Sequence, residues 1–100
     1  MTMTLRAATI IQTIEYLAIA TVCPEDGKPW NTPVYTALDE DLNFYWGSWT
    51  ENIHSRNIAA NPEVFPVIYD SRAPAGEGEG VYMQAHARAL DRLRAHLEVP

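Results

Sequence analysis

The residues best suited to chemistry lie between positions 44 and 62, FYWGSWTENIHSRNIAANP. An aromatic segment ends at Gly47 and Ser48, and a polar turn leads into a helix-like segment carrying His54, Arg56 and Asn57. Free amides and the positive end of the helix dipole attract anions at a helix start. A ligand with a planar ring and an anionic tail would therefore fit between the aromatic wall and the start of this helix.

Each of these residues also has a purely structural interpretation, and the sequence leaves both open. His54 and Arg56 could lie on a solvated helix face, and Ser48 could simply end a strand. Tyr45 and Trp46 could form a stacking platform, but alternating strand aromatics more often belong to a core or a dimer contact.

Other kinds of site lack support in the residue pattern. The three histidines do not have the spacing of a helical or hairpin metal site, so no metal is expected. Cys23 is alone and has no basic neighbour closer than Lys28, which argues against an activated thiolate. The glycines of residues 76–80 alternate with glutamates that would repel phosphate, so they are not a phosphate-binding loop. No catalytic residue is assigned.

Length and charge restrict the possible partners. The chain has 100 residues, which predicts a single domain over residues 1–100. Seven Lys and Arg against 13 Asp and Glu give a net charge of −6, which argues against nucleic acid or an anionic membrane as partner. No apolar run approaches the roughly 20 residues of a membrane span. The single cysteine fits a reducing compartment, so a cytoplasmic location is expected.

The chain divides into short elements joined by turns. Short apolar or alternating patterns predict strands at residues 16–22, 30–38, 42–48, 63–70 and 80–90. Apolar spacing predicts helices at residues 5–16, 51–60 and 91–99. For the middle helix, Thr50 is the expected N-cap, with Ile53 and Ile58 facing the sheet. Pro33 and Pro66 fall inside strands and indicate edges or bulges. The elements predict a small antiparallel barrel.

Five pieces of the sequence, in order, resemble the FMN-binding split-barrel proteins related to pyridoxamine 5′-phosphate oxidase. The matching pieces are residues 20–35, 42–48, 54–64, 67–71 and 76–90. The resemblance implies a mainly β fold with short helices, an antiparallel split β-barrel. It also implies that the barrel is incomplete at the C-terminus, because such proteins usually continue with a further helix and strands.

The resemblance implies a homodimer that holds FMN at the subunit interface and oxidises or reduces an unidentified small molecule. By position, the cofactor-binding residues would be Thr32, Pro33, Val34, Tyr45, Trp46, Gly47, Ser48, His54 and Asn57. His54 stands where these proteins often have a basic phosphate ligand, and a histidine attracts phosphate less strongly near neutral pH. The alternatives are a non-catalytic dimer that carries flavin or haem, and a reductase that uses the deazaflavin F420.

Overall fold

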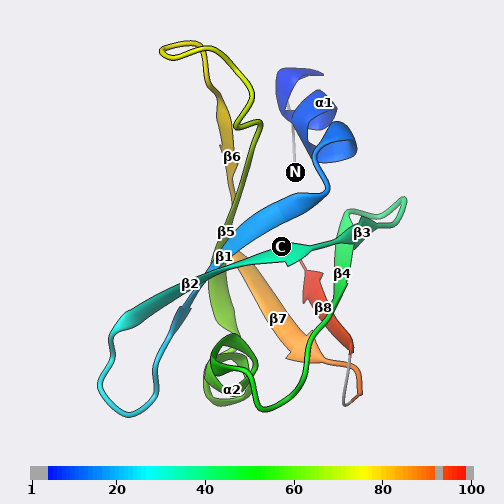
Figure 1. Cartoon of the computed structure of the whole chain (residues 1–100). Helices are drawn as coiled ribbons and strands as arrows, with labels where there is room; N and C mark the ends of the chain where they lie inside the picture. The colour runs from blue at the N-terminus through cyan, green and yellow to red at the C-terminus, as the bar shows by residue number, and fades with distance from the viewer. Residues whose placement is uncertain (1–4, 92–93, 99–100) are drawn as a thin grey trace.

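The computed structural model describes residues 5–91 and 94–98, which form one antiparallel β-barrel with two short helices (Figure 1). The helices are α1 (Leu5–Thr13) and α2 (Ile53–Ala60). The strands are β1 (Tyr16–Val22), β2 (Pro29–Tyr35), β3 (Ala37–Leu38), β4 (Asn43–Gly47), β5 (Glu63–Tyr69), β6 (Gly80–Tyr82), β7 (Ala85–Ala89) and β8 (Arg94–Glu98). The predicted fold class, an antiparallel split barrel with short helices, is confirmed.

The strand order explains how the sheet becomes a barrel. Hydrogen-bonded neighbours follow the order β2-β1-β5-β7-β8-β4-β3, and β6 pairs with β5 beside this path. The path starts at β2 and ends at β3, which are separated in the chain by Thr36 alone. Because these two strands are consecutive, the sheet curls back to where it began, which leaves few open edges.

The predicted C-terminal helix at residues 91–99 is wrong where the structure describes it. β8 pairs with β7 on one side, where Ala87 lies opposite Leu97, and with β4 on the other, where Phe44 lies opposite Leu97. Leu97 is fully buried between them. Pairing on both sides supplies hydrogen bonds to the backbone groups of β8 and buries apolar surface. The stabilisation from these tertiary contacts outweighs the weak helical preference of a short segment.

The irregularity expected at Pro66 is present. The predicted strand at residues 80–90 is divided into β6 and β7 at residues 83–84, and the Met83 amide donates to the Pro66 carbonyl at 3.1 Å. Proline offers no amide hydrogen in return, so the regular ladder breaks there. Pro33 lies in β2, which pairs with β1 alone, and an edge strand tolerates the missing donor.

Both helices are shorter than expected. α1 ends at Thr13 rather than residue 16, and its expected cap, Thr4, lies outside the described residues. The N-cap of α2 is Asn52, not Thr50, because residues 49–52 first form a turn in which the Asn52 amide donates to the Trp49 carbonyl at 3.2 Å. Ile58 is buried against the sheet as predicted.

The core fills the barrel from alternate positions of its strands. Its buried apolar members are Ile11, Leu17, Ile19, Val34, Phe44, Trp46, Ile58, Val64, Ile68, Met83, Ala85, Ala87 and Leu97. α1 contributes Ile11 to this core and α2 contributes Ile58. In the described part of the chain, neither helix has the length and apolar character needed to cross a membrane.

Candidate functional site

The best-defined polar contact near α2 joins two residues that the sequence analysis selected. His54 Nε2 and Ser48 Oγ are 2.8 Å apart, so the first turn of α2 is tied to the residue that follows β4. His54 is 6% exposed. Burial lowers the pKa of His54 below its usual value of 6.5, because desolvation disfavours the imidazolium. The pair is therefore a neutral hydrogen-bonding unit at neutral pH.

A wide, shallow pocket opens beside this pair. It encloses about 460 Å³ and is lined by Trp30, Thr32, Glu51, Asn52, Ile53 and His54. Asn52 makes no side-chain hydrogen bond as N-cap, so no cap satisfies the first amides of α2. Trp30 Nε1 donates to Thr32 Oγ1 at 2.8 Å, which holds the partly exposed indole ring against the pocket. A ring surface and an uncapped helix start therefore border one space.

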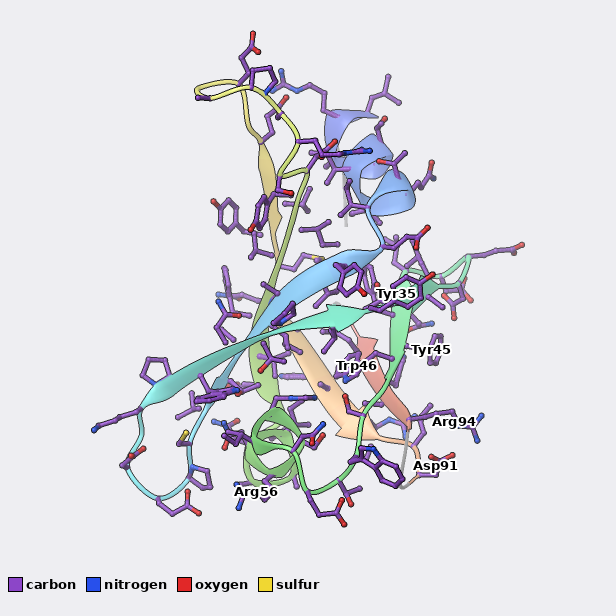
Figure 2. The ribbon with its side chains drawn as sticks, in the orientation of Figure 1. Tyr35, Tyr45, Trp46, Arg56, Asp91 and Arg94 are labelled. Carbon is purple, nitrogen blue, oxygen red and sulfur yellow. The ribbon has the colours of Figure 1, made fainter. Side chains whose placement is uncertain are left out.

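A second, smaller pocket adjoins the first along α2. It encloses about 210 Å³, and its lining includes Trp30 and Ile53, which also line the first pocket, together with Cys23, Arg56 and Asn57. Arg56 projects outward from α2 at the bottom of the view (Figure 2) and forms no ion pair with any described side chain. Its guanidinium is therefore free to meet an anion.

Asn57 fixes α2 to the barrel. It is 3% exposed, and its side-chain nitrogen donates to Thr21 Oγ1 at 3.0 Å and lies 3.6 Å from Cys23 Sγ. Thr21 faces the interior of β1, so this contact crosses from helix to sheet. Asn57 therefore holds α2 on the sheet and lines the smaller pocket with Arg56, whereas His54 lines the larger one.

The structure brings together only some of the predicted cofactor residues. Thr32 and His54 line the larger pocket, Ser48 is hydrogen-bonded to His54, and Gly47 is next to Ser48 in the chain. Val34 is part of the core. Pro33 lies on the opposite face of β2, where it lines a separate hollow.

The two aromatic residues predicted on β4 point to opposite sides of the strand (Figure 2). Tyr45 stacks on His96 with ring centroids 5.0 Å apart, and its hydroxyl donates to Asp39 Oδ2 at 3.0 Å. Trp46 is buried, and its Nε1 has no hydrogen-bond partner among the described residues. Neither side chain lines the pocket beside α2.

Sequence reasoning gave too little weight to Trp30 and Arg56. Ile53, Arg56 and Asn57 have the i, i+3, i+4 spacing that places side chains on one helix face, and this signal could have joined Arg56 to the site. Trp30 has no comparable signal, because its position next to α2 follows from the pairing of β2 with β1. Within the described ranges, no group of three or more His, Cys, Asp or Glu residues is placed to hold a metal ion.

Comparison with solved structures places the fold among split barrels. The chain aligns with the heme storage protein HutZ from Vibrio cholerae at a TM-score of 0.82 and 14% identity, covering 100% of this chain and 92% of HutZ. It aligns with a FAD-binding protein from Mesorhizobium loti at 0.79 and 13%, covering 99% and 91%. HupZ from Group A Streptococcus gives 0.76 and 16%, covering 99% and 96%.

No protein-family profile and no curated protein sequence matches the chain. At identities of 13–16%, the structural likeness defines the fold and does not transfer a ligand or an activity. The chain is thus a split-barrel protein whose site must be judged from its own residues.

Proposed function

We propose that this protein binds FMN beside the start of α2 and is a flavin-dependent oxidoreductase of a small molecule. The observation that carries the proposal is the His54–Ser48 hydrogen bond at a pocket bordered by an uncapped helix start. Free amides, together with the one N–H or O–H hydrogen that the His54–Ser48 pair does not use internally, supply donors that phosphate oxygens accept from.

The residues present fit such a cofactor in size and chemistry. The pocket of about 460 Å³ lies within the range of roughly 300–1,000 Å³ typical of small-molecule sites. Trp30 offers a flat ring surface, and Arg56 in the adjoining pocket offers an unpaired positive charge. Glu51 on the rim opposes an anion, so the positive charge of Arg56 and the free amides of α2 have to outweigh it. When bound, FMN would supply the electron-transfer chemistry, while the protein binds and orients the ring.

A homodimer is part of the proposal. The pocket is wide and shallow, so a ligand in it would stay largely open to water on a single copy of the chain. β2 carries Thr32 toward this pocket and Pro33 toward the outer sheet face. A second copy packed against the open side of the pocket would cover the ligand there.

Two alternatives are less well matched. F420 has a longer anionic tail and would need several basic residues, but Arg72 lines a different pocket and is already paired with Asp70 at 2.9 Å. Haem is the second candidate, because HutZ, a split barrel of the same fold, is a heme storage protein. His54 already shares its Nε2 with Ser48 and is buried, so it is poorly placed as a haem ligand.

The test is equilibrium titration of the purified chain with FMN, followed by removal of free flavin on a sizing column. We expect flavin absorbance to co-elute with the protein. His54→Ala, Ser48→Ala and Arg56→Ala should each weaken FMN binding by about 10-fold or more, the loss of one hydrogen bond to a charged group. His86→Ala is the matched control, because His86 is exposed on β7, outside this pocket. A colourless eluate would refute the proposal, and a Soret band after haem addition would favour the second candidate.

If FMN binds, the enzymatic part is tested separately by anaerobic addition of NADH or NADPH. Bleaching of the flavin absorbance is the expected result. If neither donor reduces the bound flavin, the protein is a flavin carrier without oxidoreductase activity toward these donors. That outcome would contradict the enzymatic proposal.

A further inference from the structure

A small basic pocket lies on β7 and β8, which run side by side in the barrel (Figure 1). It encloses about 160 Å³ and is lined by Pro62, His86, Ala87, Arg88 and His96, none of which lines either pocket beside α2. In the part of the chain that the structure describes, this lining contains no carboxylate. The other hollows each include at least one: Glu51, Glu25 and Asp70. On a chain with a net charge of −6, an anion meets little opposition here.

Arg88, His96 and Tyr45 form one row across three neighbouring strands. The register places Arg88 of β7 opposite His96 of β8, and His96 opposite Tyr45 of β4. Residues directly opposite one another lie on the same face of a sheet. Tyr45 stacks on the imidazole of His96 with an angle of 22° between the rings, and an aromatic face attracts cations. Arg88 is exposed and forms no ion pair with any described side chain, so its guanidinium is available to a ligand.

The hydrogen bonds of Asn43 decide which nitrogen of His96 is left for a ligand. Asn43 Nδ2 donates to Asp39 Oδ2 at 3.0 Å, so its Oδ1 is the atom that lies 2.9 Å from His96 Nε2. An amide oxygen only accepts, so Nε2 carries the hydrogen. Nδ1 has no hydrogen-bond partner among the described residues, although His96 is only 7% exposed. Buried polar groups normally have a partner, and here the pocket offers room for one.

The carboxylates near this row have other partners or other positions. Asp39 accepts four hydrogen bonds from residues 41–45. Glu63 and Glu98 lie opposite His86 in register, one on either side, so His86 is not assigned to a ligand, and no carboxylate lies opposite Arg88. The titratable and charged groups around His96 are Arg88 and His86 from β7, Tyr45 from β4, Asp39 before β4, Glu63 from β5, and Arg94 and Glu98 from β8 itself.

The size of the pocket restricts the anion. At roughly 30 Å³ for a water molecule, 160 Å³ corresponds to about five waters. One tetrahedral oxyanion fits this space, whereas a flavin or nucleotide ring system does not. The planar fork of an arginine matches the oxygens of phosphate, and a protonated imidazole nitrogen supplies a further donor.

We propose that this pocket binds one phosphate-sized oxyanion between the Arg88 guanidinium and His96 Nδ1. The guanidinium donates to two oxygens, and Nδ1 donates to a third once the ring is protonated. Because a bare Nδ1 would repel an anion, binding takes up one proton at His96, and affinity falls as the pH rises. Neither residue belongs to the site beside α2, so this anion site stands apart from FMN binding.

The test is an NMR titration of the backbone amides of the cofactor-free chain with inorganic phosphate at pH 6.5, with chloride holding the ionic strength constant. The amides of Arg88 and His96 should shift saturably, with a Kd on the order of 1 mM. Arg88→Gln should weaken binding by about 10-fold or more, because it removes a charged donor. Arg72→Gln is the matched control: it changes the net charge equally, but Arg72 is paired with Asp70 and lines a different hollow. It should change the Kd by less than about twofold, because salt screens distant charges.

Sulfate tests the proton on His96 separately, because sulfate itself carries no proton between pH 6 and pH 8. The wild type should bind sulfate about 10-fold more weakly at pH 8 than at pH 6, since histidine loses its charge over this range. His96→Gln should lose most of this dependence, because glutamine does not titrate. Glycerol phosphate distinguishes two sources of the anion: tighter binding than inorganic phosphate identifies a phosphate ester, and equal or weaker binding identifies the free ion.

Three results would overturn the anion site. These are shifts no larger than chloride alone produces, equal losses of affinity in Arg88→Gln and Arg72→Gln, and an unchanged pH dependence in His96→Gln. The amides of Asn52 and His54 report the pocket beside α2 in the same spectra, so phosphate that binds only there is recognised and also counts against the site on β7 and β8. Because no flavin is added, failure here is distinct from failure to bind FMN.

Discussion

The contact between Asn57 and Thr21 provides a quantitative test of how α2 is held on the barrel. Both side chains are almost fully buried, at 3% and 2% exposure, and the Asn57 amide donates to Thr21 Oγ1 at 3.0 Å. Asn57→Ala removes the donor and leaves the hydroxyl without this partner. The lost hydrogen bond and the stranded polar atom should together cost about 2 kcal/mol. For a domain of this size that corresponds to a fall in Tm of roughly 8–16 °C.

The assay is urea unfolding of Asn57→Ala, Thr21→Val and the double variant. Each single variant strands one polar group, whereas the double variant strands neither. The double variant should therefore lose about 1 kcal/mol less than the two single losses combined. Gln84→Ala, which shortens an exposed amide side chain, should change the free energy of unfolding by less than about 0.5 kcal/mol. Additivity of the two single variants within about 0.3 kcal/mol would refute the coupling.

Three further outcomes follow from other contacts. Burial depresses the pKa of His54, so the folded state disfavours its protonated form and the free energy of unfolding should fall as the pH drops below 6.5. Urea unfolding between pH 7.5 and 5 should show a smaller dependence of this free energy on pH for His54→Gln than for the wild type. Equal dependence in the two proteins would contradict the prediction. The Arg72 guanidinium lowers the pKa of Asp70 to about 2, so in an NMR titration Arg72→Ala should move it toward 3.8, and an unchanged value would exclude the pair. Leu97 is fully buried, so Leu97→Ala should cost about 3 kcal/mol in urea unfolding, and a loss below about 1 kcal/mol would mean that β8 does not close the barrel.

Local patterns were enough to predict most of the sheet. β1 and β5 agree with the predicted strands within one residue, because their alternation of buried and outward-facing side chains is a local signal with a period of two. The turn at residues 23–28 was likewise predictable, since Gly27 takes a positive φ of 72° that glycine adopts freely. The barrel itself was expected both from the strand pattern and from the resemblance to split-barrel flavoproteins.

The C-terminal strand illustrates what local patterns could not decide. Residues 94–98 have too few apolar positions to distinguish helix from strand by themselves. β8 forms because β7 and β4 present unpaired backbone groups on either side of it, and β4, unlike the neighbouring β7, lies far away in sequence. The start of α2 was misplaced for a related reason, because the turn at residues 49–52 was missed.

For the candidate site as well, the sequence indicated some features and the tertiary structure alone decided others. Residue types alone made Ser48 and His54, six positions apart, candidates for a site, and the resemblance to split-barrel flavoproteins then assigned them to a cofactor. That Trp30 and Thr32 border the same pocket depends on the long-range pairing of β2 with β1, and on the packing of α2 against both strands. The sequence by itself determined which donors were available near α2. Only the tertiary structure determined which of them face one space, because sheet pairing brings together residues that no local period connects.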